Sequence, residues 1–452
     1  MRPTGRLHLG HYFGALQNWL KLQNSRLPAG ARLPAERGLS AAEGLRANSG
    51  NTEGQPEYEC FFFVADWHAL TTHYEDTSSV AENTLQVVTD WLAVGLDPAK
   101  STLFVQSNIL EHAELHVLLS MITPLSWLER VPTYKEQIEN LKDRELGTYG
   151  FLGYPLLQAA DIVMYGDPKV DLLVPVGEDQ APHVELTREV VRRFNAHFGI
   201  HVDEGLFRPD NWLARDIFEY FQSTVPSLPA TYWMDEPKTE DECRLKIRRA
   251  IRSQAFEEGL ENYRNRLHNE LAKYVRLEQV LREPDYVPTE TPRLPGTDGR
   301  RMAKSYGNAI WLSDPPDQIR DKARNMMTDP QRVRRTDPGR PEVCPVFAYH
   351  KLFSPPDVIA WSDHGCRTAG IGCVDCKRAM ADQLVRWIEP IQARRKEFEA
   401  HPEQVWDILD RGSDVARKSA KRTMKRVRNA IFKWDEARKL KGPSVATARS
   451  NG

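Results

Sequence analysis

Residues 2–11 read RPTGRLHLGH and run directly into YFGALQNWL at residues 12–20, in which apolar residues recur at helical spacing. This pattern predicts a helix that begins near His8 and His11. A helix N-terminus carries unsatisfied N–H groups and the positive end of the helix dipole, which favour a bound polyphosphate. We expect Gly10 to leave room for a nucleotide, and the two imidazoles to donate hydrogen bonds to an α-phosphate.

A second candidate half-site is RMAKS at residues 301–305, on a polar loop that follows Gly296 and Gly299. We expect this loop to keep the Lys304 ammonium close to the pyrophosphate as it leaves. Read alone, each half-site is also explained by a solvated surface segment, so the prediction depends on finding both. The residues expected to contact the nucleotide are Arg2, Pro3, Thr4, Gly10, His11, Arg301, Met302, Ala303, Lys304 and Ser305, with His8, His11 and Lys304 as the catalytic residues.

Further motifs lie between the half-sites: YPLLQAAD at 154–161, VPVGEDQ at 174–180, and PHVELTREVVRRFN at 182–195. Together with the half-sites they resemble the class I aminoacyl-tRNA synthetases, and specifically the bacterial tryptophanyl-tRNA synthetases. The resemblance implies activation of L-tryptophan by Mg·ATP, followed by transfer to the cognate tRNA. It covers residues 1–23, 58–198 and 293–441.

The local patterns predict an α/β fold. The apolar run CFFFVA at 60–65 is typical of a strand buried on both faces of a parallel sheet, and TLFVQ at 102–106 is the next predicted strand. A helix that ends near Val94 separates them, and this alternation favours a doubly wound domain. The resemblance implies the same architecture, a Rossmann-like doubly wound parallel sheet followed by an α-helical anticodon-binding domain.

Five segments are expected along the chain. They are a catalytic domain at 1–198 with an insertion at about 24–57, a charged helical insertion at 199–291, a return of the catalytic domain at 292–316, a helical anticodon-binding domain at 317–442, and a flexible tail at 443–452. The resemblance lapses in the second insertion, whose charges are mixed in sign. A solvated helical surface therefore explains it better than a dedicated RNA contact.

Composition agrees with a soluble protein of two or three domains, because 40% of the 452 residues are hydrophobic and 27% are charged. No apolar run approaches the length of a membrane span, and no signal peptide pattern opens the chain. We therefore expect a cytoplasmic location and no membrane partner. The six cysteines are then expected to be thiols or metal ligands rather than disulfides.

Tryptophan has one distinguishing polar group, the indole N–H, so a selective pocket needs a fixed acceptor in an apolar cavity. Asp161 is the predicted acceptor, and the resemblance assigns the aspartate at this position to the indole nitrogen. Tyr154 and Gln158 share a helix face with Asp161. The resemblance also implies that Tyr154 and Gln180 hold the α-amino group and that His68 lies beside the indole, although a structural role explains this histidine equally well.

Three residues after a predicted strand, Gly177, Glu178 and Asp179, are expected to bind ATP, with Gly177 and Asp179 at the ribose. Two departures from the family accompany these matches. Its second signature is usually Lys-Met-Ser-Lys-Ser, whereas this chain carries Arg301 and Ala303, so we expect activity with altered ATP binding. Family members also carry an innermost β-strand before the first half-site, so we expect that the start of this chain is truncated.

Four cysteines, Cys344, Cys366, Cys373 and Cys376, lie close together in the sequence with glycines between them. Four thiolates in a cytoplasmic protein hold tetrahedral Zn²⁺ or a [4Fe–4S] cluster. Some bacterial tryptophanyl-tRNA synthetases carry a four-cysteine cluster motif in this region, and CRTAGIGCVDC at 366–376 resembles it. The resemblance favours iron–sulfur, with zinc and then unligated thiols as the alternatives.

The chain is basic from Arg411 to Lys441, with Phe432 and Trp434 nearby. A solvated basic helix explains this charge pattern as well as RNA binding does, but in the family's anticodon domain tRNA binding is the better prediction. The expected contacts are Lys418, Lys421, Arg422, Lys425 and Arg426. The resemblance also implies a homodimer.

Two alternatives stay open. A tyrosyl-tRNA synthetase shares both half-sites and a Tyr-x3-Gln-x2-Asp arrangement, although the GEDQ and HVELTRE motifs favour tryptophan. A paralogue that binds tRNA or a protein partner without charging tRNA would explain Ala303 and the missing strand.

Overall fold

The two strands predicted first form a parallel pair, β1 (Cys60–Val64) and β2 (Ser101–Val105), with Cys60 opposite Ser101. A second parallel pair consists of β3 (Leu172–Val176) and β6 (Pro284–Pro288). The computed structural model describes residues 1–26, 57–132, 147–207, 240–267, 269–288 and 294–439. Within them the parallel pairing is confirmed, but no ladder joins the two pairs into one sheet.

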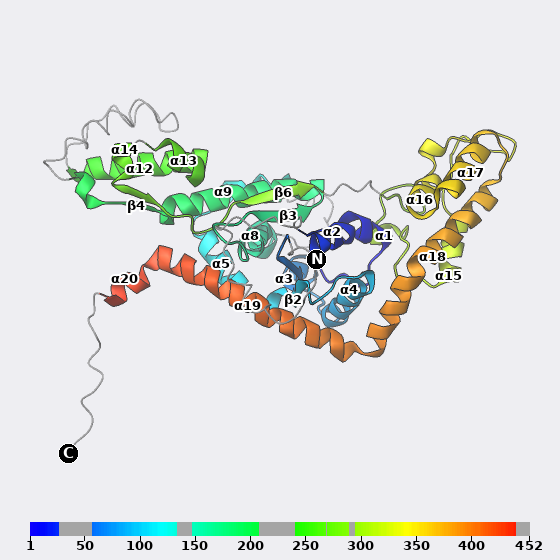
Figure 1. Ribbon diagram of the computed structural model, residues 1–452, viewed down its shortest axis with the longest axis horizontal. Helices are drawn as coiled ribbons and strands as arrows, with labels where there is room; N and C mark the ends of the chain where they lie inside the picture. The colour runs from blue at the N-terminus through cyan, green and yellow to red at the C-terminus, as the bar shows by residue number, and fades with distance from the viewer. Residues whose placement is uncertain (27–56, 133–146, 208–239, 268, 289–293, 440–452) are drawn as a thin grey trace, which may run out of the picture.

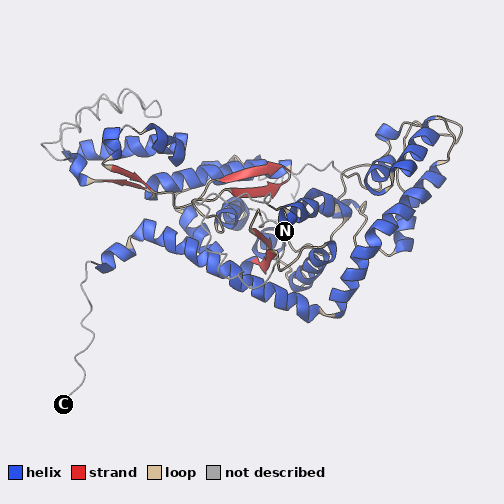
Figure 2. Ribbon diagram, viewed as in Figure 1, coloured by secondary structure: helices blue, strands red, loops and turns tan. Residues whose placement is uncertain are grey.

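Helices surround the strand pairs (Figures 1 and 2). The first half-site enters a continuous helical segment made of α1 (Leu9–His11), a π-helical turn (Tyr12–Leu16) and α2 (Gln17–Asn24). The other helices of this part are α3 (Asp66–His73), α4 (Val80–Val94), α5 (Glu111–Ser120), α6 (Leu125–Glu129), α8 (Tyr149–Val163) and α9 (Ala181–Phe198). The helix start near His8 and the helix end at Val94 are as predicted.

The described part of the second insertion has a hydrophobic core of its own. It contains α12 (Glu240–Glu258), α13 (Leu260–Arg266), α14 (Asn269–Ala272) and the antiparallel pair β4 (Ile200–Val202) and β5 (Val275–Leu277). Its core residues include Ile247, Ile251, Leu260 and Tyr263. The insertion is therefore a small folded unit on α9. The insertion predicted at about 24–57 and the tail at 443–452 lie almost entirely outside the described residues.

The C-terminal region is helical, as expected from the resemblance. Its helices are α15 (Pro316–Arg324), α16 (Pro345–Phe353), α17 (Pro356–Arg367), α18 (Cys373–Ala400), α19 (Pro402–Phe432) and α20 (Trp434–Lys439). Figure 1 shows α18 leading away from α16 and α17, and α19 running along the catalytic part. No described helix is long and apolar enough to cross a membrane.

One hydrophobic core joins the N-terminal part to the C-terminal helices. It contains Trp91 of α4 and Leu103 of β2 together with Leu384 of α18 and Leu409 of α19. Helix α19 lies directly against β2, because a Cβ atom at Gly412 would be only 1.8 Å from the carbonyl oxygen of Leu103. The helix and strand backbones touch at this point, and only glycine fits there.

We expect Gly412→Ala to lower the free energy of unfolding by about 2 kcal/mol or more, because the new methyl group collides with backbone rather than with a flexible side chain. Urea denaturation of the full chain measures the change. Gly14→Ala is the matched control, because no atom lies within 4 Å of a Cβ there. Equal stability of the two variants would contradict the close packing of α19 on β2.

Candidate functional site

The two predicted half-sites lie side by side. The amide of Leu9 donates to the carbonyl of Ile310 at 3.0 Å, and the amide of Leu312 donates to the carbonyl of Leu7 at 2.9 Å. The Lys304 ammonium donates to the carbonyl oxygen of Thr4 at 2.9 Å. Backbone pairing just after the second half-site thus brings its lysine into the first half-site.

The rings of His8 and His11 lie close together, with centroids 3.8 Å apart and planes tilted by 34°. Burial lowers the pKa of His11 to about 4, and burial together with His11 lowers the pKa of His8 to about 3, so both rings are neutral at physiological pH. The backbone amide of His8 donates to Nδ1 of His11 at 3.2 Å. The neutral His11 ring therefore carries its proton on Nε2, which is a hydrogen-bond donor without a net charge.

Gly10 makes room for the neighbouring histidine. A Cβ atom at this position would be 2.9 Å from Nδ1 of His8 and 3.6 Å from Cβ of Met302 in the second half-site. Close packing against His8 and Met302 therefore explains the glycine at this position. The expected close approach of a nucleotide to Gly10 stays a prediction.

The first half-site is also fixed from the side of the helical region. The amide of Leu7 donates to the carboxylate of Asp90 at 2.7 Å, and Arg395 of α18 donates to the other oxygen of the same carboxylate. Burial raises the pKa of Asp90 to about 6, so the carboxyl is ionised at neutral pH. Gln392, also on α18, donates to the carbonyls of Leu312 and Asp314 at 3.1 and 2.6 Å.

A cavity of about 860 Å³ lies between β1 and β3. This volume is in the range of small-molecule sites. Its lining contains all five residues of the predicted tryptophan pocket: His68 from α3, Tyr154, Gln158 and Asp161 from one face of α8, and Gln180 after β3. The structure therefore brings the predicted pocket residues together.

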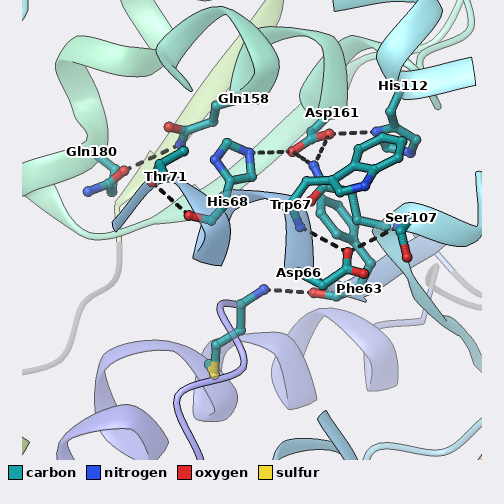
Figure 3. A network of polar contacts seen from close by, with 12 residues as sticks. Phe63, Asp66, Trp67, His68, Thr71, Ser107, His112, Gln158, Asp161 and Gln180 are labelled. Carbon is teal, nitrogen blue, oxygen red and sulfur yellow. Dashed lines mark hydrogen bonds and ion pairs between the residues drawn. The ribbon is translucent and has the colours of Figure 1, made fainter. Parts of the chain in front are cut away.

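Asp161 is the centre of a buried polar network (Figure 3). His68 Nε2 lies 2.8 Å from one carboxylate oxygen, His112 Nδ1 lies 2.5 Å from the other, and the amide of Gln106 donates to both oxygens at 2.8 Å. Burial alone would raise the pKa of Asp161, but His112 and His68 outweigh it and hold that pKa well below its usual range. Asp161 is thus a fixed anionic acceptor.

Sequence analysis missed Gln106, His112 and Tyr165. Gln106 opens the 3₁₀ turn Gln106–Asn108 directly after β2, and His112 is in the first turn of α5. Polar residues at the carboxyl ends of parallel strands were the available signal, because ligands of α/β sheets gather there. Tyr165 follows α8 and has its hydroxyl 2.6 Å from Nε2 of His112.

The remaining pocket residues connect to the predicted ribose site. Gln158 donates to Gln180 at 3.3 Å, and Gln180 donates to Asp179 at 3.1 Å. Gly177 directly follows β3, and Glu178 and Asp179 lie in a 3₁₀ turn that leads into α9, as the strand-to-helix prediction requires.

The four cysteines come together at the start of α18. Cys344 precedes α16, Cys366 is in the last turn of α17, and Cys373 and Cys376 are in the first turn of α18. Burial raises the pKa of Cys376 to about 11, with the other three thiols adding to the effect. All are free thiols. In the described ranges, however, no group of three or more His, Cys, Asp or Glu is arranged to hold a metal ion.

The predicted tRNA contacts lie on α19 but differ in their surroundings. Lys418, Lys421, Arg422 and Lys425 are exposed on its outer face, and Arg422 also lines the cavity. Arg426 is half-buried and donates to the carbonyl of Gly166 at 2.8 Å. Four of the five side chains are thus accessible, and the fifth attaches α19 to the catalytic part.

The chain is similar in sequence to known tRNA synthetases. The profile of the family described as tRNA synthetases class I (W and Y) matches residues 51–224 and 254–388. A tryptophan–tRNA ligase of Ralstonia nicotianae is 44% identical, covering 95% of this chain and 96% of that protein. A tryptophan–tRNA ligase of Thermotoga maritima is 39% identical, covering 95% and 97%.

Solved structures share the fold. The crystal structure of a tryptophanyl-tRNA synthetase from Campylobacter jejuni, complexed with ADP and tryptophan, matches with a TM-score of 0.63 at 23% identity, covering 95% of this chain and 98% of that chain. A tryptophanyl-tRNA synthetase from Mycoplasma pneumoniae matches with a TM-score of 0.57 at 22% identity, covering 95% of each chain.

The depressed histidine pKa values predict a pH-dependent stability. As pH falls from 6.5 towards 4, the unfolded chain binds a proton at His11 and the native chain does not, so stability falls. His11→Asn removes this uptake and should reduce the loss over that window by on the order of 2 kcal/mol. Urea unfolding at several pH values measures it, with the exposed His73→Asn as control. An unchanged pH slope in His11→Asn would contradict the buried neutral ring.

Proposed function

This chain belongs to the class I tRNA synthetases of the tryptophan and tyrosine family, and we propose that it activates L-tryptophan with ATP and transfers it to tRNA(Trp). The observation that best supports this proposal is the buried carboxylate of Asp161 on the wall of the cavity. An anionic acceptor on the wall of the cavity suits an indole N–H, which only donates hydrogen bonds. We place the activity in the cytoplasm.

Activation requires positioning and charge stabilisation. The tryptophan carboxylate attacks the α-phosphorus, a new oxygen–phosphorus bond forms, and the bond to the bridging oxygen breaks as pyrophosphate leaves. No general base is needed, because the attacking carboxylate is already ionised. Nε2 of neutral His11 donates to the α-phosphate, and the Lys304 ammonium attracts the departing pyrophosphate. Mg²⁺ accompanies ATP and neutralises phosphate charge.

The outer face of α19 is the proposed tRNA surface. Lys418, Lys421, Arg422 and Lys425 lie there, and phosphate contacts by such side chains supply most of the affinity for nucleic acids. Phe432 and Trp434 at the end of α19 are 47% and 53% exposed, and their ring centroids lie 5.6 Å apart, which suits stacking on unpaired bases. Arg426 also contributes by holding α19 in place.

An apolar face of α5 supports the proposed homodimer. Leu110, Val117 and Met121 lie on or beside this helix and are 70%, 49% and 75% exposed, and Leu125 at the start of α6 is 58% exposed. Large apolar side chains gathered on one surface mark interaction sites in soluble proteins. A second copy of this chain is the proposed partner.

The activity is tested by amino-acid-dependent exchange of pyrophosphate into ATP. We expect tryptophan to support exchange and tyrosine not to, and Asp161→Ala to reduce the tryptophan rate more than about tenfold, or 1.4 kcal/mol. Asp407→Ala, which alters an exposed aspartate on α19, is the control. Exchange with tyrosine instead would identify a tyrosyl enzyme. No exchange with either, in a chain that binds tRNA, would identify a non-charging paralogue.

We also infer that Cys344, Cys366, Cys373 and Cys376 hold a [4Fe–4S] cluster. Four thiols converge from three helices, and a purely thiol donor set suits iron–sulfur clusters and zinc. The expected role of the cluster is structural, because activation and transfer include no redox step.

Protein purified without oxygen should be brown, absorb broadly at about 400 nm, and contain about four iron atoms per chain. Cys373→Ala should lose the iron, and Cys60→Ala, outside the group, should keep it. Loss of the cluster should reduce tRNA charging more than tryptophan activation. Stoichiometric zinc without iron would refute the cluster, and a metal-free protein that charges tRNA normally would refute any metal role.

A further inference from the structure

Two of the donors to Asp161 reach it from behind the cavity wall. In the described part of the chain, the cavity lining includes Asp161 and His68 but neither Gln106 nor His112. Both are fully buried, with no exposed side-chain surface. They bind the carboxylate from the carboxyl end of β2 and from α5, whereas α8 carries the carboxylate itself. Asp161 is therefore supported on the side that a substrate does not occupy.

The contact between His112 and Asp161 has a defined direction. An ionised carboxylate only accepts hydrogen bonds, so Nδ1 of His112 donates to it across 2.5 Å. Tyr165 Oη lies 2.6 Å from Nε2 of the same ring. Burial raises the pKa of Tyr165, so the hydroxyl stays protonated and bonds to Nε2, as donor to a neutral ring or as acceptor from a charged one. Tyr165 thus fixes the orientation of the ring whose Nδ1 faces Asp161.

Gln106 fixes the plane of the carboxylate. Its amide nitrogen lies 2.8 Å from both oxygens of Asp161, and two contacts from one donor group oppose rotation of the carboxylate. Gln106 cannot move far, because it is fully buried at the end of β2. The carboxylate is held by fixed groups on two sides.

We propose that Gln106, His112 and Tyr165 are positioning residues for Asp161, and that selection for an amino acid with an indole N–H depends on them. The inference rests on the proposed function and extends it to residues whose polar groups bind Asp161 or His112, although the Tyr165 side chain also lines the cavity. Without rear donors, a carboxylate in an apolar cavity takes up a proton or rotates, and it loses the fixed lone pair that reads the N–H.

The test compares tryptophan with its benzothiophene analogue, in which sulfur replaces the N–H and the ring shape is kept. For each variant, the ratio of kcat/KM for the two amino acids is measured by pyrophosphate exchange. His112→Leu removes the Nδ1 donor and should lower this ratio by roughly tenfold or more. His112→Asn places an amide N–H near the position of Nδ1 and should restore most of the ratio.

Tyr165→Phe provides a milder variant should His112→Leu fail to fold, because it removes one hydroxyl and leaves the ring. It should lower the ratio less than His112→Leu, and Gln106→Met should also lower it. Equal losses for both amino acids would indicate a purely structural role and overturn the inference, as would an unchanged ratio in Tyr165→Phe and Gln106→Met. Absence of tryptophan-dependent exchange in the unaltered chain would contradict the proposed function itself. Exchange with unchanged selectivity in the variants would overturn this inference alone.

Discussion

The carboxylate of Asp90 joins three parts of the molecule. One oxygen accepts the amide of Leu7 in the first half-site, the other accepts the guanidinium of Arg395 on α18, and the carboxylate itself belongs to α4. Asp90 and Arg395 are both nearly inaccessible to solvent, with side-chain exposures of 0% and 3%. Removing one partner of a buried pair costs far more than removing a surface pair, because the other charge is left without compensation. The position of the first half-site therefore depends on a helix of the C-terminal region.

Helix α18 contacts both halves of the proposed nucleotide site. Arg395 reaches the first through Asp90, and Gln392 binds the carbonyl of Leu312 in the segment that pairs with Leu7. The first turn of the same helix carries Cys373 and Cys376. A metal centre that fixes this turn would hold the start of the helix that leads into α19, which gives a structural cofactor a role in placing the proposed tRNA surface. Helix α19, with its basic face, follows α18 directly in the chain. A tRNA bound there would therefore contact a helix connected to the one that holds both half-sites.

Sequence patterns predicted the features that depend on residues close together in the chain. The strands at the centre, the helix start near His11, and the face of α8 with Asp161 follow from spacing and burial. Contacts between distant segments did not follow, because no local pattern encodes them. Asp90 and Arg395 are 305 residues apart in sequence, and His112 reaches Asp161 from another helix. The two half-sites could be matched across the chain only because both have recognisable signatures. The sequence predicted one parallel sheet, whereas no ladder joins the two parallel strand pairs within the described residues.

Helix α18 is proposed to align the nucleotide half-sites through Asp90. The direct measurement is the KM for ATP in tryptophan-dependent pyrophosphate exchange for Arg395→Met, whose side chain keeps much of the length of the stem without the charge. Circular dichroism confirms that the variant is folded, and equilibrium titration gives its tryptophan affinity. Alignment through Asp90 predicts a KM for ATP raised by about tenfold with tryptophan affinity within about twofold of the unaltered chain. A folded variant with an unchanged KM for ATP would contradict it.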